Sequence, residues 1–213
     1  MKKLFLSLSV LTLGFTFMSA QGASSLTGKI IALDAGHGGG ETGAVGYCGN
    51  GGVTVKVLES DVNLAVRAEL TSLLTSAGAI AYSIGQLPTR KERVADAESV
   101  GSDVLISIHH NGSSNVSADY TQSFVTQRND KEFAKYIHPR IASALGLTDK
   151  GIKNDGYGMT VYGSLPGILT ESYFITNTTA ACDFVNYQVG ASNTRVQKEA
   201  QAMYNGLLAY FSR

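Results

Sequence analysis

The alternation of apolar and polar residues along the chain predicts strands separated by helices. The apolar run at 29–34 stops at a cluster of glycines, as expected of a short buried strand. Residues 58–77 carry an apolar residue at every third or fourth position, which gives a helix one apolar face. These apolar positions are Val62, Val66, Leu70 and Leu73. Gly78, a residue type that often follows a helix, marks its end.

The remaining pattern predicts an α/β fold. Further strands are expected at 79–84, 103–108, 120–126, 159–162 and 167–170, and further helices at 89–100, 130–145 and 192–211. Residues 36–52 hold nine glycines and are expected to form a long loop. Strands that alternate with helices favour a single domain, with a mostly parallel mixed sheet of about six strands and helices on both faces.

The first residues have the composition of an export signal. Lys2 and Lys3 precede an almost wholly apolar run at 4–18, and small residues follow it. This pattern predicts a signal peptide at 1–20, with cleavage as late as residue 23, and a catalytic domain at 24–213. An uncleaved anchor is the alternative, although the run is short for a membrane span. We therefore expect a periplasmic or secreted protein with no membrane span once the signal is removed.

Composition excludes some classes of partner. Loss of Lys2 and Lys3 leaves 15 basic and 17 acidic residues, a net charge near −2. Such a chain has no general attraction for nucleic acid or anionic membranes. Hydrophobic residues make up 44% of the sequence, enough for the core of one domain. We expect a monomer that does not bind nucleic acid.

Four polar residues lie at positions where the predicted fold would place catalytic or metal-binding side chains. His37, His109 and Glu171 each follow or end a predicted strand, and Glu59 opens the first long helix. The carboxyl ends of parallel strands meet at one edge of a sheet, so these side chains are expected to converge. Two histidines and a carboxylate are a known ligand set for catalytic zinc, and another carboxylate can then move protons.

Each residue also has a structural interpretation. Glu59 in a first helical turn complements the helix dipole, and His109 alone fits a hydrogen-bonded core histidine. Asn63, one turn after Glu59, suits either a residue that steadies the site or a helix-surface residue, and the surface is favoured slightly. His138 matches no motif and is expected at the surface. Spacing alone leaves these alternatives open.

Several short motifs, in order, strengthen the zinc interpretation. The sequence resembles the zinc-dependent N-acetylmuramoyl-L-alanine amidases of the Amidase_3 type, and the resemblance extends from residue 29 to the end of the chain. The motifs are DAGHGG at 34–39, ESDVNL at 59–64, TR at 89–90 with Arg93, SIHHN at 107–111, KGIK at 150–153 and LPGILTE at 165–171.

The resemblance implies the chemistry of the site. By motif position, His37, Glu59 and His109 would bind one Zn²⁺ ion and Glu171 would be the catalytic acid/base. The substrate would be peptidoglycan, cut at the amide bond between N-acetylmuramic acid and L-alanine of the stem peptide. Two alternatives remain at this stage: a zinc peptidase that cuts within the stem peptide, and a wall-binding module without activity.

Two further expectations concern the loops. Cys48 and Cys182 are the only cysteines, and both lie in segments expected to leave the same edge of the sheet, so an exported chain permits a disulfide between them. Two unpaired cysteines are the alternative. Some amidases that resemble this chain carry a blocking helix between the second histidine and the final glutamate. Here 61 residues separate His109 and Glu171, too few for an added helix, so no activator is expected.

Overall fold

The computed structural model describes residues 24–50, 52–156 and 158–213. The predicted signal peptide at 1–20 lies outside these residues. Within them, no helix combines the length and the apolar composition needed to cross a membrane.

The centre of the molecule is a six-stranded sheet in the order β4-β1-β5-β8-β6-β7. Only the β6–β8 pairing is antiparallel, so the predicted mostly parallel mixed sheet of about six strands is confirmed. The strands are β1 (Ile30–Ala35), β4 (Ile80–Ser83), β5 (Val104–Asn111), β6 (Tyr120–Phe124), β7 (Thr148–Lys153) and β8 (Gly167–Phe174).

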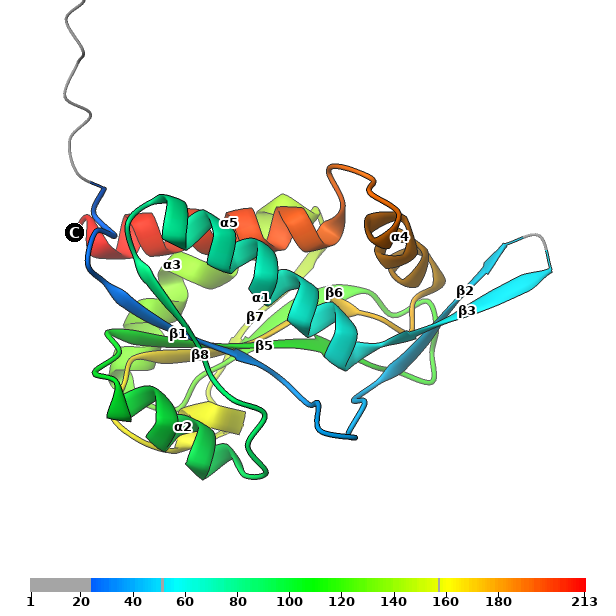
Figure 1. Cartoon of the computed structure of the whole chain (residues 1–213). Helices are drawn as coiled ribbons and strands as arrows, with labels where there is room; N and C mark the ends of the chain where they lie inside the picture. The colour runs from blue at the N-terminus through cyan, green and yellow to red at the C-terminus, as the bar shows by residue number, and fades with distance from the viewer. Residues whose placement is uncertain (1–23, 51, 157) are drawn as a thin grey trace, which may run out of the picture.

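Helices cover both faces of this sheet, as predicted. Three long helices, α1 (Glu59–Ser76), α3 (Arg128–Leu145) and α5 (Arg195–Phe211), form one layer, and α2 (Arg90–Ser99) lies on the other side (Figure 1). The larger hydrophobic core lies under the three-helix layer and a smaller core lies under α2. Because β1, β5 and β8 are parallel neighbours, their carboxyl ends meet at one edge of this sheet.

The local sequence explains where two of these helices lie. Val62, Val66 and Leu70 of α1 are fully buried, and each such side chain contributes about 1.5–3 kcal/mol through its burial. Thr89 accepts a hydrogen bond from the Glu92 backbone N–H, and the Glu92 side chain bonds back to Thr89. This capping box fixes the start of α2, a contribution of about 1 kcal/mol.

The expected loop at 36–52 is only partly a loop. From residue 45 the chain forms an antiparallel hairpin of β2 (Val45–Asn50) and β3 (Val53–Leu58), which projects from the body of the molecule (Figure 1). The glycines of β2 hid this strand from the sequence pattern. Close packing explains one of them, because a Cβ atom on Gly46 would overlap the Ile175 carbonyl oxygen.

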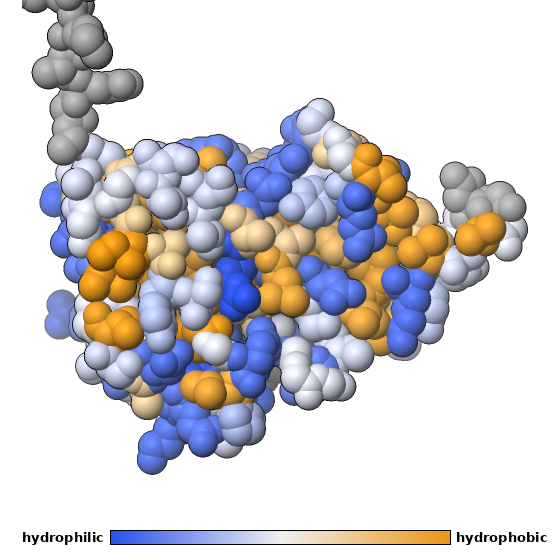
Figure 2. Space-filling model, viewed as in Figure 1, coloured by the Kyte–Doolittle hydropathy of each residue, from blue (hydrophilic) through white to orange (hydrophobic). Residues whose placement is uncertain are grey.

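A disulfide between Cys48 and Cys182 joins β2 to α4 (Thr178–Gln188), so the predicted pairing is confirmed. Hydrophobic side chains gather at this end of the molecule, along the hairpin and α4 (Figure 2). Val53 of β3 is 67% exposed. The covalent bond holds an arm that has little buried surface of its own.

Other predicted elements differ from the structure. Residues 159–162 are not a strand, because Gly158–Val161 form the 3-10 helix η1. Helix α4 and strand β7 were not predicted. Strand β8 continues beyond residue 170 to Phe174, and all eight of its residues are buried, including polar ones. That extension carries Glu171 inside the sheet and not at the end of the strand.

Candidate active site

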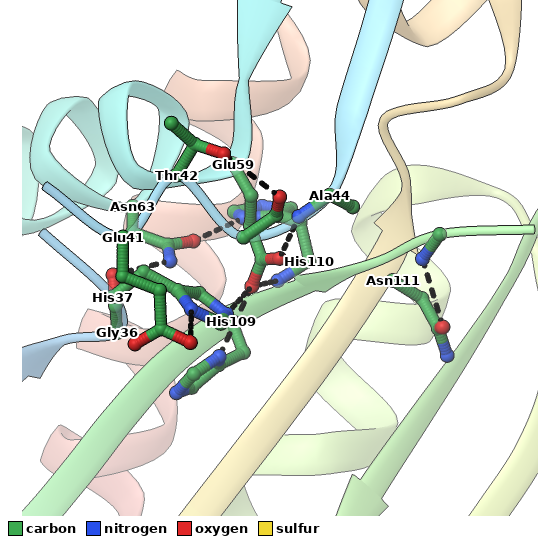
Figure 3. A network of polar contacts seen from close by, with 12 residues as sticks. Gly36, His37, Glu41, Thr42, Ala44, Glu59, Asn63, His109, His110 and Asn111 are labelled. Atoms are coloured by element: carbon green, nitrogen blue, oxygen red, sulfur yellow. Dashed lines mark hydrogen bonds and ion pairs between the residues drawn. The ribbon is translucent and has the colours of Figure 1, made fainter.

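The fold brings together the three predicted metal ligands. His37 lies in the loop after β1, Glu59 is the first residue of α1 and His109 lies near the end of β5. One ligand atom from each lies within 4.8 Å of the others. Figure 3 shows the three side chains converging from these separate elements.

The Glu59 carboxylate is the centre of this cluster. Its Oε1 atom lies 3.1 Å from His37 Nε2 and 3.0 Å from His109 Nδ1. The same oxygen accepts the backbone N–H of His110 at 3.2 Å, and Oε2 accepts that of Ala44 at 2.9 Å (Figure 3). Both carboxylate oxygens are therefore fixed by the backbone, and Oε1 faces both rings.

These contacts set the charge states of the cluster. Burial by itself raises the pKa of Glu59, but hydrogen bonds with His109 and His37 outweigh it and hold that pKa well below its ordinary value. The hydrogen bond with Glu59 is the main cause of a raised pKa at His37. An anionic oxygen between two imidazoles is thus an environment that favours a bound cation.

Two glycines make room for these side chains. A Cβ atom on Gly36 would overlap the His109 ring, and one on Gly43 would overlap both Glu59 and the His37 ring. Gly43 also has a φ of +66°, a conformation that other residues adopt rarely. His37 itself has a φ of 64°, so the loop holds this ligand in a left-handed conformation.

Arg93 of α2 holds the His37 loop in place. Its guanidinium donates to Asp34 Oδ1 at 2.8 Å and to the His37 carbonyl oxygen at 3.1 Å. The Ser107 hydroxyl donates to the other Asp34 oxygen at 2.7 Å. The sequence motifs contained Asp34, Arg93 and Ser107, but only the structure shows that they form one hydrogen-bonded support for the loop.

Glu171 stands beside the cluster and makes few contacts of its own. It is the Cα partner of His109 in the parallel pairing of β5 and β8, so both side chains point to the same face of the sheet. Its buried Oε2 atom has no hydrogen-bond partner among the described residues. Burial, reinforced by the negative charges of Glu59 and Glu199, raises the pKa of Glu171 to about 8.

The cluster opens into a cleft of about 480 Å³. His37, Glu59, His109 and Glu171 all line it, and so do Arg90 and Asn111. Two imidazole nitrogens, one carboxylate oxygen and an open side fit a catalytic zinc ion, which takes three protein ligands. Glu171 lines the same cleft, so the donor set and the fourth residue both fit a metal-dependent hydrolase.

Sequence reasoning misplaced two residues. Asn63, slightly favoured as a surface residue, is fully buried and bonds to the Gly36 carbonyl oxygen at 3.0 Å. His138, expected at the surface, is 2% exposed and lies between Ser123 and Asp149. The position of Asn63, one helical turn after Glu59, did indicate that its side chain could lie near the site. No sequence signal marked His138, because its partners come from other elements.

Comparison with known proteins agrees with this geometry. The N-acetylmuramoyl-L-alanine amidase family, Amidase_3, matches residues 31–209. The catalytic domain of CwlV, an N-acetylmuramoyl-L-alanine amidase from Bacillus (Paenibacillus) polymyxa var. colistinus, has a similar structure, with a TM-score of 0.73 and 26% sequence identity. The similarity covers 86% of this chain and 98% of that domain.

Two proteins of Bacillus subtilis (strain 168) are similar in sequence. The uncharacterized protein YqiI is 34% identical over the full length of both chains. N-acetylmuramoyl-L-alanine amidase LytC is 30% identical over 92% of this chain, which spans 38% of LytC. The chain belongs to the N-acetylmuramoyl-L-alanine amidase family. The predicted amidase activity is thereby confirmed, in preference to a zinc peptidase or an inactive wall-binding module.

Proposed function

We propose that this chain cuts peptidoglycan at a single Zn²⁺ ion held by His37, Glu59 and His109, with Glu171 as the catalytic acid/base. The observation that carries the proposal is the convergence of these three ligand atoms within 4.8 Å, beside the unpaired carboxyl oxygen of Glu171. A zinc ion in such a site polarises a carbonyl group and lowers the pKa of water.

The residues of the chain supply the remaining steps. The bond that breaks joins the lactyl carbonyl carbon of N-acetylmuramic acid to the nitrogen of L-alanine, and the water oxygen takes the place of that nitrogen. Glu171 is placed to accept a proton from the attacking water and to pass it to the leaving nitrogen. A group that performs both transfers works best when its pKa lies near the pH of the reaction. The products are a lactyl carboxylate and a free L-alanine amino group.

The supports of the ligands have a catalytic consequence. The backbone N–H groups of Ala44 and His110 fix the Glu59 carboxylate, and Arg93 fixes the loop that carries His37. Ligands held in this way need little rearrangement when the cation binds. The site would therefore be ready for substrate as soon as it is loaded with zinc.

We further propose that the catalytic domain acts outside the cytoplasm, alone and as a monomer. Signal-like residues at 1–20 and a disulfide between Cys48 and Cys182 support export. Among the described residues between His109 and Glu171, the only helices are α3 and η1. The described part of that region holds no additional helix that could cover the cleft.

Product analysis tests the proposed reaction. Purified peptidoglycan digested by the zinc-loaded chain should release full-length stem peptides that carry free L-alanine amino termini. A stem-peptide cut would instead release shorter peptides with other amino termini. Digestion by the Glu171→Gln variant, prepared in the same way, controls for contaminating hydrolases.

A further inference from the structure

The adjacent residues His109 and His110 point to opposite faces of the sheet. His109 faces the cleft, whereas the His110 ring is 1% exposed under the three-helix layer and lies 4.3 Å from the Tyr173 ring. We propose that His110, Asn63 and Glu199 form a buried network that positions the metal ligands. This inference rests on the proposed metal site and concerns positioning residues, because none of the three side chains reaches the reacting atoms.

Asn63 connects the three segments that carry the ligands. It lies on α1 one turn after Glu59, and its Nδ2 atom donates to the carbonyl oxygen of Gly36, the residue before His37. Its Oδ1 atom lies 2.6 Å from Nδ1 of His110, the residue after His109 (Figure 3). One amide group thus ties α1, the β1 loop and β5 together at the positions next to the ligands.

The contacts also fix the direction of the hydrogen bond between Asn63 and His110. Because the Asn63 amide nitrogen donates to a carbonyl, its oxygen must accept from His110 Nδ1. His110 Nε2 lies 2.9 Å from Glu199 Oε2, within hydrogen-bond distance. The Ser172 hydroxyl donates to the other Glu199 oxygen at 2.6 Å. The ring is therefore held at both nitrogens.

The network reaches the metal site through the backbone. The N–H of His110 donates to Glu59 Oε1, the oxygen that faces both histidine ligands. Ser172, at the far end, directly follows Glu171 in β8. A shift of the His110 ring would move the backbone donor that orients the central ligand. Glu199 on α5 would in this way influence a site that lies on the opposite face of the sheet.

A second buried histidine provides a matched comparison. His138 contacts Ser123 Oγ at 2.9 Å and Asp149 Oδ1 at 2.7 Å. Like His110, it therefore connects a neutral polar side chain to a carboxylate. It lies on α3 and its partners come from β6 and β7, and none of these elements carries a proposed metal ligand. If such networks only hold elements together, disruption of either one should have the same effect on metal binding.

The test is the affinity of the metal-free chain for Zn²⁺, measured by competition with a chromogenic chelator. Glu199→Ala and Asn63→Ala should weaken binding by about 10- to 100-fold, the usual effect of losing a group that orients a metal ligand. Glu199→Gln keeps an amide that can hydrogen-bond both His110 Nε2 and the Ser172 hydroxyl, and it should stay within about threefold of the unsubstituted chain. Asp149→Ala, the control, should bind as tightly as the unsubstituted chain.

Two further measurements separate positioning from stability. Circular dichroism and urea unfolding establish that each variant is folded, and Asn63→Ala carries the test if Glu199→Ala does not fold. The absorption spectrum of the Co²⁺-loaded chain should change in Asn63→Ala and not in Asp149→Ala.

The outcomes that overturn the inference are distinct. Unchanged Zn²⁺ affinity in folded Asn63→Ala and Glu199→Ala would overturn the positioning role and leave the metal site in place. Equally weakened Zn²⁺ binding in Asp149→Ala would show that the network affects the metal only through the general stability of the fold. An unsubstituted chain that binds no Zn²⁺ would overturn the metal site and this inference together.

Discussion

Glu171 and His109 are partners in the register of two parallel strands, and that pairing places an unpaired buried carboxyl oxygen beside a candidate metal ligand. His109 contacts Glu59, whereas Oε2 of Glu171 has no partner among the described residues. Two neighbouring residues thus have different surroundings, one fit for holding a cation and the other for exchanging protons.

Activity should depend on zinc. A strong chelator should abolish peptidoglycan digestion, and added Zn²⁺ should restore it. His37→Ala and His109→Ala should each remove the bound metal, because each takes away one of three ligands. Metal analysis of the folded, dialysed proteins measures the loss. Full activity in the metal-free chain would contradict the assignment.

Glu171→Gln should separate catalysis from metal binding. A glutamine cannot exchange the proton, so turnover should fall by roughly 10²- to 10⁴-fold, the range for a positioned acid/base. The zinc content should stay at one ion per chain, since Glu171 contributes no ligand atom to the cluster. Steady-state digestion rates and metal analysis of the same preparation test both statements. Loss of zinc in this variant would show that Glu171 is itself a ligand.

The same substitution should change how stability depends on pH. With its pKa near 8, Glu171 keeps its proton in the folded metal-free chain while the unfolded chain ionises near pH 4.5. The folded state therefore binds more protons between these values, and its stability falls as pH rises toward 8. Glu171→Gln lacks this loss, which is on the order of a few kcal/mol.

Urea unfolding of the two metal-free proteins at pH 5 and pH 8 measures the effect. The stability of the unsubstituted chain relative to Glu171→Gln should decrease between the two values. A difference that stays constant with pH would mean that the folded and unfolded states titrate alike at this residue.

The disulfide should stabilise the domain. Cys48 and Cys182 close a loop across 134 residues, so removal of the bond should cost roughly 2–5 kcal/mol. The double substitution Cys48→Ser and Cys182→Ser should lower the urea midpoint, and reductant should affect only the unsubstituted chain. Detection of two free thiols in the folded, non-reduced protein would rule the bond out.

The purified, zinc-loaded chain should digest peptidoglycan without a partner. The cleft is lined by its own residues, and the described segment between the second histidine and the final glutamate holds no helix beyond α3 and η1. Turbidity loss of a cell-wall suspension measures activity, with Glu171→Gln as the control. A chain that stays inert until a partner is added, or until the β2–β3 hairpin is shortened, would show that the site is gated.

The sequence by itself determined the reaction class and the framework of the fold. The ordered motifs around His37, Glu59, His109 and Glu171 named the residues that the structure brings to one cleft. Helical periodicity located α1 and α5 to within a few residues, because one apolar face against a sheet is a local pattern. These features depend on residue type and spacing along the chain.

Tertiary structure alone decided which polar residues are buried and why. Asn63 and His138 are buried against partners on other secondary-structure elements, which the sequence pattern around each residue does not reveal. The glycines around Cys48 indicated a loop, yet cross-strand pairing and the Cys182 disulfide make that segment a hairpin. Burial and strand pairing depend on contacts between distant segments, and only the folded chain brings those segments together.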